Sequence, residues 1–124
     1  MNIIISNSSE HPIYTQITNQ IKKAIIQGEL KPETQLPSIR RLAKELQVSV
    51  ITTKRAYEEL EKEGFITTVP GKGSYVAPRS SELLKESKMK LVEDKLEEAI
   101  VAAKLINLNL EDLIKIIELL YEEA

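Results

Sequence analysis

Three short segments with helically spaced apolar residues lie close together in the first half of the chain, and they limit how it can fold. The first covers residues 12–27 and begins at Pro12, which suits a first helical position because its missing N–H would be unpaired there. The second covers residues 39–46 and the third residues 50–63. A tight turn at Gln47-Val48 separates them, and Gly64 ends the third. The spacing therefore predicts three helices, the last two joined as in a helix-turn-helix.

The second and third of these helices each follow a serine that is expected to cap them. The hydroxyl groups of Ser38 and Ser49 can each accept a hydrogen bond from a free N–H in the first helical turn. The periodicity also predicts which side chains face the core. They are Ile39, Leu42, Ala43 and Leu46 in the second helix and Thr53, Ala56, Tyr57 and Leu60 in the third.

A β-hairpin is predicted directly after the third helix. Residues 65–69 and 74–76 are rich in β-branched and aromatic residues, and Pro70-Gly71-Lys72-Gly73 between them forms a turn sequence with a basic tip. Three helices followed by a hairpin predict a mainly α-helical winged helix-turn-helix, in which the hairpin is the wing.

Two more helices are predicted after a linker at residues 78–81. In the first, apolar residues recur at alternating spacings of three and four, as in a coiled-coil seam, and Asn109 is expected to cap the second. Two helices cannot enclose a core, so either the first domain or another copy of the chain must cover their apolar stripes, and the second copy is favoured. We therefore expect two domains, residues 1–79 and a dimerisation domain at residues 80–124. The expected dimer interface comprises Met89, Val92, Leu96, Ala99, Ala103, Ile106, Leu113 and Ile117.

Composition excludes several classes of function. The chain has no cysteine and one histidine, His11, so it lacks thiolate ligands and the histidine partner of a serine nucleophile. Its carboxylate clusters are typical of solvated helix faces, and no metal, cofactor or enzymatic activity is expected. No apolar run approaches the ~20 residues of a membrane-spanning helix. Ile3-Ile4-Ile5, a short strand or an apolar lead-in, has no basic flank and is not a secretory signal. A cytoplasmic protein is expected.

Charge is unevenly divided along the chain. Residues 1–79 carry eleven basic and eight acidic side chains, whereas residues 80–124 carry six and eleven. The predicted outward face of the third helix presents Ser49, Val50, Ile51, Lys54, Arg55 and Glu58. Arg40 and Arg41 precede this helix, and Lys72 follows it at the hairpin tip. The major groove admits one helix, and a helix with cations on both sides fits it, so duplex DNA is the predicted partner.

Four motifs follow one another between residues 10 and 77. They are Pro12-Ile13-Tyr14-x-Gln16-Ile17, Leu36-Pro37-Ser38-Ile39-Arg40-Arg41-Leu42-Ala43, Ala56-Tyr57-x-x-Leu60-Glu61-x-x-Gly64-Phe65-Ile66 and Gly71-Lys72-Gly73-Ser74-Tyr75-Val76. In this order and register they resemble the GntR family of bacterial transcription regulators. The short C-terminal pair of helices looks like the YtrA-like branch, which has two helices where other branches carry a large effector-binding domain.

The resemblance implies a homodimeric repressor that binds a palindromic operator, with the third helix in the major groove and the wing in the minor groove. It places Ser38 and Arg40 at phosphate or base contacts near the groove edge. At the start of the recognition helix it assigns DNA contacts to Ser49, Val50, Ile51, Thr52 and Lys54. In the wing it assigns them to Gly71, Lys72 and Gly73, where missing side chains let the backbone approach the sugar-phosphate chain.

The chain departs from the family pattern at three positions. Glu33 stands where the family usually has glycine, Val50 where many members have arginine or proline, and Thr53 where they have valine. The Thr53 hydroxyl can bond back to the Ser49 carbonyl, so little loss of fold is expected. Val50 and Ile51 can touch thymine methyl groups but cannot bind guanine bidentately, which predicts A·T pairs beneath them.

Two questions stay open at the level of sequence. A winged-helix domain can also bind proteins, so a protein-interaction module without operator binding is the alternative function. Two helices offer too little structure for a large effector pocket, and a small-molecule effector is not expected, although a pocket between subunits stays an alternative. Neither the operator sequence nor the regulated genes follow from the residues.

Overall fold

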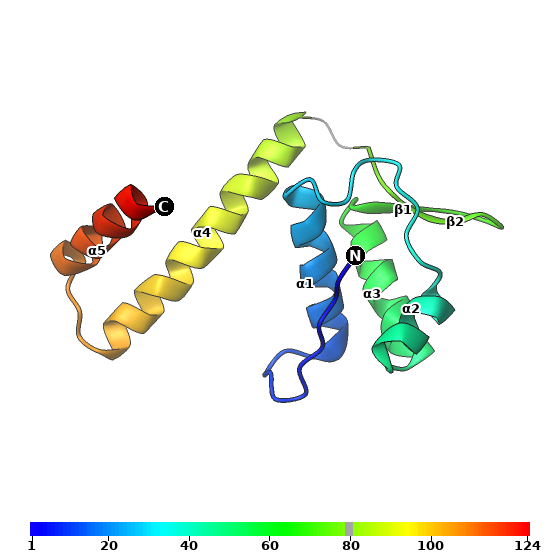
Figure 1. The fold of residues 1–124 in the computed structure, drawn as a ribbon, viewed down its shortest axis with the longest axis horizontal. Coiled ribbons are helices and arrows are strands. Elements are labelled where there is room, and N and C mark those ends of the chain that lie inside the picture. The colour runs from blue at the N-terminus through cyan, green and yellow to red at the C-terminus, as the bar shows by residue number, and fades with distance from the viewer. Residues whose placement is uncertain (79–80) are drawn as a thin grey trace. The chain divides into compact units, whose positions relative to one another are not determined.

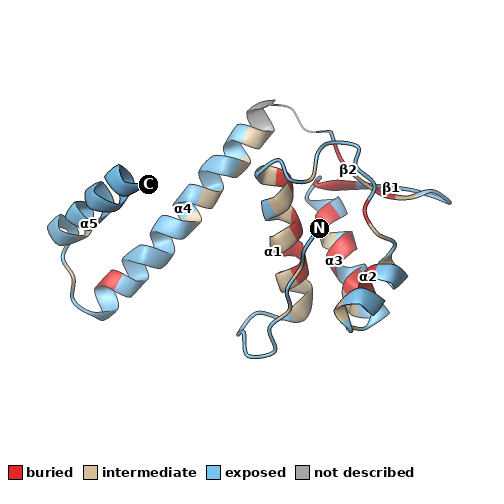
Figure 2. Cartoon of the chain, in the orientation of Figure 1, coloured by how far each residue is buried: buried red, intermediate tan, exposed pale blue. Residues whose placement is uncertain are grey.

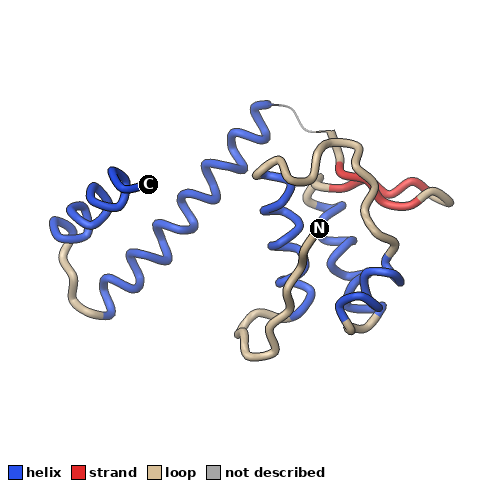
Figure 3. Tube along the Cα trace, in the orientation of Figure 1, coloured by secondary structure: helices blue, strands red, loops and turns tan. Residues whose placement is uncertain are grey.

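The computed structural model describes residues 1–78 and 81–124, and it divides the chain into two compact units, Met1–Leu84 and Lys85–Ala124. The expected domain boundary between residues 79 and 80 lies outside the described residues. Figures 1 and 3 show the elements of the first unit, three helices followed by a hairpin. They are α1 (Ile13–Ile26), α2 (Ile39–Leu46), α3 (Val50–Lys62), β1 (Ile66–Val69) and β2 (Gly73–Val76).

The core of the first unit lies between its three helices and the hairpin. Both α1 and α2 pack against α3, and Figure 2 shows the buried side of each helix in red. The buried apolar cluster consists of Ile17, Ile21, Ile25, Leu36, Leu42, Ala56, Tyr57, Leu60, Phe65, Ile66 and Val76. Together with the wing, this arrangement confirms the predicted winged helix-turn-helix. Ile39 and Leu46 of α2 pack against this cluster, as predicted, although both are only half-buried.

The predicted helix caps are confirmed. Ser38 Oγ accepts a hydrogen bond from the Arg41 N–H at 3.1 Å, and Ser49 Oγ accepts one from the Thr52 N–H at 3.0 Å. The turn between α2 and α3 passes through Gln47, which takes a left-handed conformation at φ 57°. At α1 the prediction is off by one residue, because Pro12 precedes the helix and its carbonyl accepts from the Gln16 N–H.

The loop between α1 and α2 runs along β2 and forms hydrogen bonds with it. β1 and β2 pair antiparallel with Ile66 opposite Val76, and the loop joins β2 through a bridge between Gln35 and Tyr75. The Val76 N–H donates to the Thr34 carbonyl, and the Val76 carbonyl accepts from the Glu33 N–H. The loop is therefore attached along β2 before it enters α2, which the sequence did not predict.

The N-terminal segment is extended but is not a strand, contrary to one of the two alternatives for Ile3-Ile4-Ile5. Two glutamine side chains of α1 form the hydrogen bonds with its backbone that a neighbouring strand would otherwise form. Gln20 bonds both the N–H and the carbonyl of Ile4, at 2.9 and 2.7 Å, and Gln16 does the same for Ser6, at 2.8 and 2.9 Å. Ile3 and Ile5 pack against the core cluster, so the segment is an apolar lead-in held along α1.

The second unit contains the two predicted C-terminal helices, except for residues 81–84 at the start of the first helix, which are grouped with the first unit. The two helices are α4 (Ser81–Leu105) and α5 (Leu110–Glu123), and Asn109 caps α5 by accepting from the Asp112 N–H at 2.9 Å. The last residue of the predicted seam, Ile106, lies beyond the end of α4, in a turn that contains Asn107 at φ 56°. Across residues 1–78 and 81–124, no helix is both long and apolar enough to cross a bilayer.

Candidate nucleic-acid interface

One face of α3 is turned away from the core and presents the side chains predicted to bind DNA. Thr53 is fully buried and its hydroxyl donates to the Ser49 carbonyl at 3.1 Å, as predicted. On the opposite face, Ile51 is 80% exposed and Val50 is 47% exposed. An exposed apolar pair therefore lies at the start of the helix.

Polar residues flank this apolar pair. Ser49 and Thr52 are joined by a hydrogen bond between their hydroxyl groups at 2.7 Å, next to the free N–H groups of the first turn. Lys54 is exposed and lies 3.9 Å from the Glu58 carboxylate one turn later. Hydroxyl groups and a cation beside an apolar pair give α3 the means to bind phosphates and to touch thymine methyl groups.

Arg55 is held by a side chain that the sequence analysis did not single out for function. Its guanidinium lies over the ring of Tyr14, 3.9 Å from the centroid, and donates to the Tyr14 hydroxyl at 3.2 Å. A guanidinium stacked on a tyrosine ring loses little further freedom when it binds an anion. Tyr14 belongs to α1, so the contact also joins α1 to the exposed face of α3.

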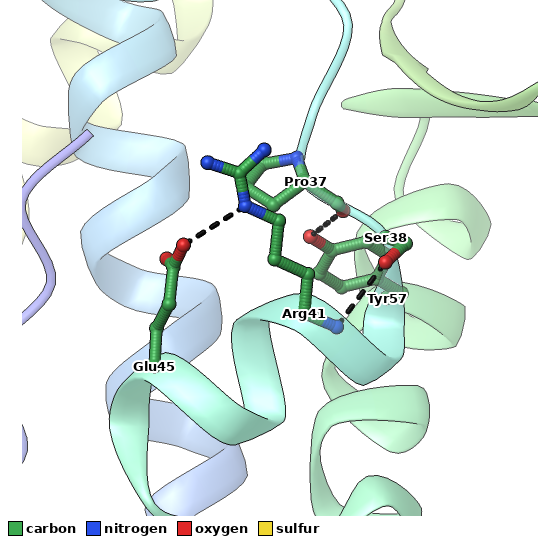
Figure 4. A network of polar contacts seen from close by, with 5 residues as sticks. All are labelled: Pro37, Ser38, Arg41, Glu45 and Tyr57. Carbon is green, nitrogen blue, oxygen red and sulfur yellow. Dashed lines mark hydrogen bonds and ion pairs between the residues drawn. The ribbon is translucent and has the colours of Figure 1, made fainter.

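A polar network fixes the start of α2, where Ser38 and Arg41 lie (Figure 4), and Arg40 lies between them in the sequence. The Arg41 Nε donates to Glu45 at 2.9 Å, one turn along α2. The Tyr57 hydroxyl of α3 donates to the Pro37 carbonyl at 2.7 Å. This hydrogen bond connects the segment before α2 to α3.

Tyr57 is the buried member of this network, and its environment favours the neutral phenol. Desolvation raises the pKa of Tyr57 far above its ordinary value, and the Glu45 carboxylate adds to the rise. The hydroxyl therefore keeps its proton and remains a hydrogen-bond donor through the physiological range.

The wing tip presents Lys72 between two glycines. Gly71 and Gly73 both have positive φ, and Gly73, at φ 113°, is in a region that side chains rarely adopt. The carbonyl of Lys72 accepts from the Gln35 amide at 3.0 Å and from the Tyr75 hydroxyl at 3.4 Å. Lys72 itself is exposed. The tip therefore combines a free cation with a backbone that is fixed from two sides.

The structure thus brings the predicted residues of α2, α3 and the wing into one unit, and it adds Tyr14, Gln35 and Tyr57 as residues that hold them. None of the ion pairs among the described residues includes Arg40 or Lys72. These two cations are free to bind phosphate, whereas Arg41 must exchange Glu45 for it. Among the described residues, no group of three or more His, Cys, Asp or Glu could hold a metal ion.

The chain is similar to a known family and to a curated relative of that family. The family described as "Bacterial regulatory proteins, gntR family" matches residues 13–76. The "HTH-type transcriptional repressor YtrA" of Bacillus subtilis is 38% identical over 111 residues, which cover 90% of this chain and 85% of that protein.

Among solved structures, a "GntR family transcriptional regulator from Listeria monocytogenes" has a TM-score of 0.77 at 30% identity, covering 92% of this chain and 97% of that one. The structure of AraR(DBD) in complex with operator ORE1 has a TM-score of 0.53 at 27% identity, covering 62% and 94%. The last of these shows a similar domain bound to an operator.

Proposed function

The chain belongs to the GntR family of bacterial regulatory proteins, and from this premise we propose that it is a transcriptional repressor that binds a palindromic operator as a homodimer. Membership confirms the prediction of a DNA-binding regulator and not an enzyme. The observation that carries the proposal is the outward face of α3. Ile51 on this face is 80% exposed to solvent, although the opposite face of the helix is buried in the core.

In the proposed complex, α3 lies in the major groove and the wing reaches the minor groove. The exposed residues Val50, Ile51 and Lys54 begin the helix that would enter the groove. The wing is a narrow hairpin with glycines on both sides of Lys72, which suits close approach to the sugar-phosphate chain. The predicted contacts at Ser38, Arg40 and Arg41 fall at the start of α2, and those at Ser49, Thr52 and Arg55 fall on or next to α3.

The homodimer is proposed because the second unit has almost no buried apolar residue of its own. Of the expected interface residues, Ala103 is buried and Leu113 is half-buried, whereas Met89, Val92, Leu96, Ala99, Ile106 and Ile117 are exposed. Helices that leave this much apolar surface in water need a partner, and a second copy meets the need symmetrically. Two winged-helix domains related by a twofold axis require two half-sites related in the same way, and such an operator is palindromic.

The exposed apolar pair also gives a sequence preference. Val50 and Ile51 have no hydrogen-bonding side chain, so they can recognise the thymine methyl group but not the edge of guanine. We propose half-sites with A·T pairs beneath these two residues. Selection of bound duplexes from a random pool tests this directly, and an invariant G·C pair at those positions would contradict it.

The decisive experiment measures the affinity of the full chain for the selected duplex over a range of salt concentrations. If binding neutralises about six phosphates, log K falls with log salt at a slope of roughly −5. Lys54→Ala is expected to weaken binding, whereas Lys23→Ala, a matched exposed lysine in the last turn of α1, is not. A chain that selects no duplex at low salt would instead be a protein-interaction module.

We place the protein in the bacterial cytoplasm, where its operator would be. A C-terminal unit of two helices offers too little structure for a large effector pocket, so we propose regulation through protein level or a bound partner and not through a small-molecule effector. The same selection experiment, repeated with candidate metabolites, would show an effector as a change in affinity.

A further inference from the structure

We propose that Gln35 is a positioning residue for DNA binding, which fixes the wing tip so that Lys72 meets a phosphate at a set distance from the helices. The inference rests on the proposed function, because it concerns how the same interface is held together. No family motif identified in the sequence includes Gln35, which lies between Glu33 and the Leu36-Pro37-Ser38 motif.

Gln35 contacts the wing tip directly. The Gln35 Nε2 donates to the Lys72 carbonyl at 3.0 Å across 37 residues of chain. Apart from the Tyr75 hydroxyl at 3.4 Å, no other side chain among the described residues bonds this carbonyl. Without Gln35, this carbonyl would keep only the long bond from the Tyr75 hydroxyl among the side-chain bonds of the described residues.

Gly73 leaves room for the Gln35 amide. A Cβ atom built at Gly73 would come within 3.1 Å of Gln35 Nε2, closer than most such contacts in proteins. The absence of a side chain at Gly73 therefore lets the amide reach the carbonyl of the preceding residue.

Gln35 lies on a segment whose backbone is hydrogen-bonded to the wing on both sides of it. On one side of it, Thr34 accepts from the Val76 N–H, and on the other the Leu36 N–H donates to the Ser74 carbonyl. Two residues later the Pro37 carbonyl accepts from the Tyr57 hydroxyl of α3. Gln35 therefore connects the wing tip to the same backbone that leads into α2, and it links two groups of DNA contacts.

The test is a double-mutant cycle on the full chain, using the duplex that the wild-type protein selects from a random pool. Gln35→Ala is expected to weaken binding about fivefold. This is the change in affinity that corresponds to the net contribution of one neutral hydrogen bond. In a Lys72→Ala background the same change is expected to have less than about a twofold effect, because the contact it positions is gone. Gln27→Ala, an exposed glutamine after α1 without such a bond, is the matched control.

Two further readouts separate positioning from general stability. Gln35→Ala should make the salt slope shallower by up to about one, as Lys72→Ala does, while the melting temperature stays close to wild type. Amide order parameters of Lys72 and Gly73 should fall in the free variant. Equal losses of affinity in both backgrounds, or an unchanged affinity, would overturn the inference while leaving the operator-binding function intact. A wild-type chain that binds no duplex would overturn the proposed function itself.

Discussion

Replacing Tyr57 with phenylalanine should destabilise the first unit and also change how its stability depends on pH. The substitution keeps the buried ring and removes only the hydroxyl group that donates to the Pro37 carbonyl at 2.7 Å. The loss includes the hydrogen bond and leaves a carbonyl without its partner, so the free energy of unfolding should fall by about 1–2 kcal/mol near pH 7. For a domain of this size, each kcal/mol lowers the melting temperature by roughly 4–8 °C.

The pH dependence follows from the raised pKa of Tyr57. In the unfolded chain the phenol loses its proton above about pH 10, whereas in the folded state it keeps it. The stabilisation from this group is therefore complete below pH 10 and is lost as the pH rises further, by up to about 1.4 kcal/mol per pH unit. Tyr57→Phe has no such group, so the difference in the free energy of unfolding between the two proteins should become smaller above pH 10.

Urea unfolding between pH 7 and pH 11, at a fixed protein concentration, measures both effects. Tyr121→Phe is the control, because Tyr121 is 83% exposed and its loss should change stability by less than about 0.5 kcal/mol. If the wild-type and Tyr57→Phe curves stay parallel up to pH 11, the hydroxyl is not held neutral by the fold. If they coincide at pH 7, the hydrogen bond to Pro37 contributes nothing.

Three other predictions concern separate parts of the chain. Glu33→Gly should raise the free energy of unfolding by about 1 kcal/mol, because Glu33 has φ 67°; an unchanged melting temperature would argue against strain there. Tyr14→Leu should weaken DNA binding in the wild type but not in an Arg55→Ala background, since the ring acts through the guanidinium; equal losses would refute this. Leu96→Glu should convert a dimer to a monomer in sedimentation, because it introduces an unpaired charge into the seam, whereas Lys88→Glu should not.

Local chemistry made most of the first unit predictable. Ser38, Ser49 and Asn109 cap helices through hydrogen bonds that span three residues, and Thr53 bonds back over four. Such bonds depend only on residue type and spacing, which a single sequence contains. The inward face of α3 follows in the same way from a period of 3.6 residues.

The missing parts of the site depend on contacts between distant residues. Gln35 reaches Lys72 and Tyr14 stacks on Arg55 only after the fold has brought them together, 37 and 41 residues apart. Nothing in the local pattern distinguishes Gln35 from an ordinary exposed glutamine. The departure at Glu33 did carry a signal, because the family's usual glycine at this position indicates positive φ, and the structure has φ 67° there.

The uneven charge explains why dimerisation should matter more for affinity than any one phosphate contact. Charges act on DNA mainly within about 10 Å at ordinary salt, so the position of each cation counts, and the overall charge of −2 does not exclude DNA binding. Yet the first 79 residues hold only eleven basic against eight acidic side chains, and Glu45 and Glu58 lie beside Arg41 and Lys54. We therefore expect a single winged-helix domain to bind phosphate weakly. Two linked domains would gain affinity, because the second domain would bind its half-site at a high effective concentration once the first is bound. On this reasoning Leu96→Glu should weaken operator binding more than Lys72→Ala does, and the reverse order would mean that single domains suffice.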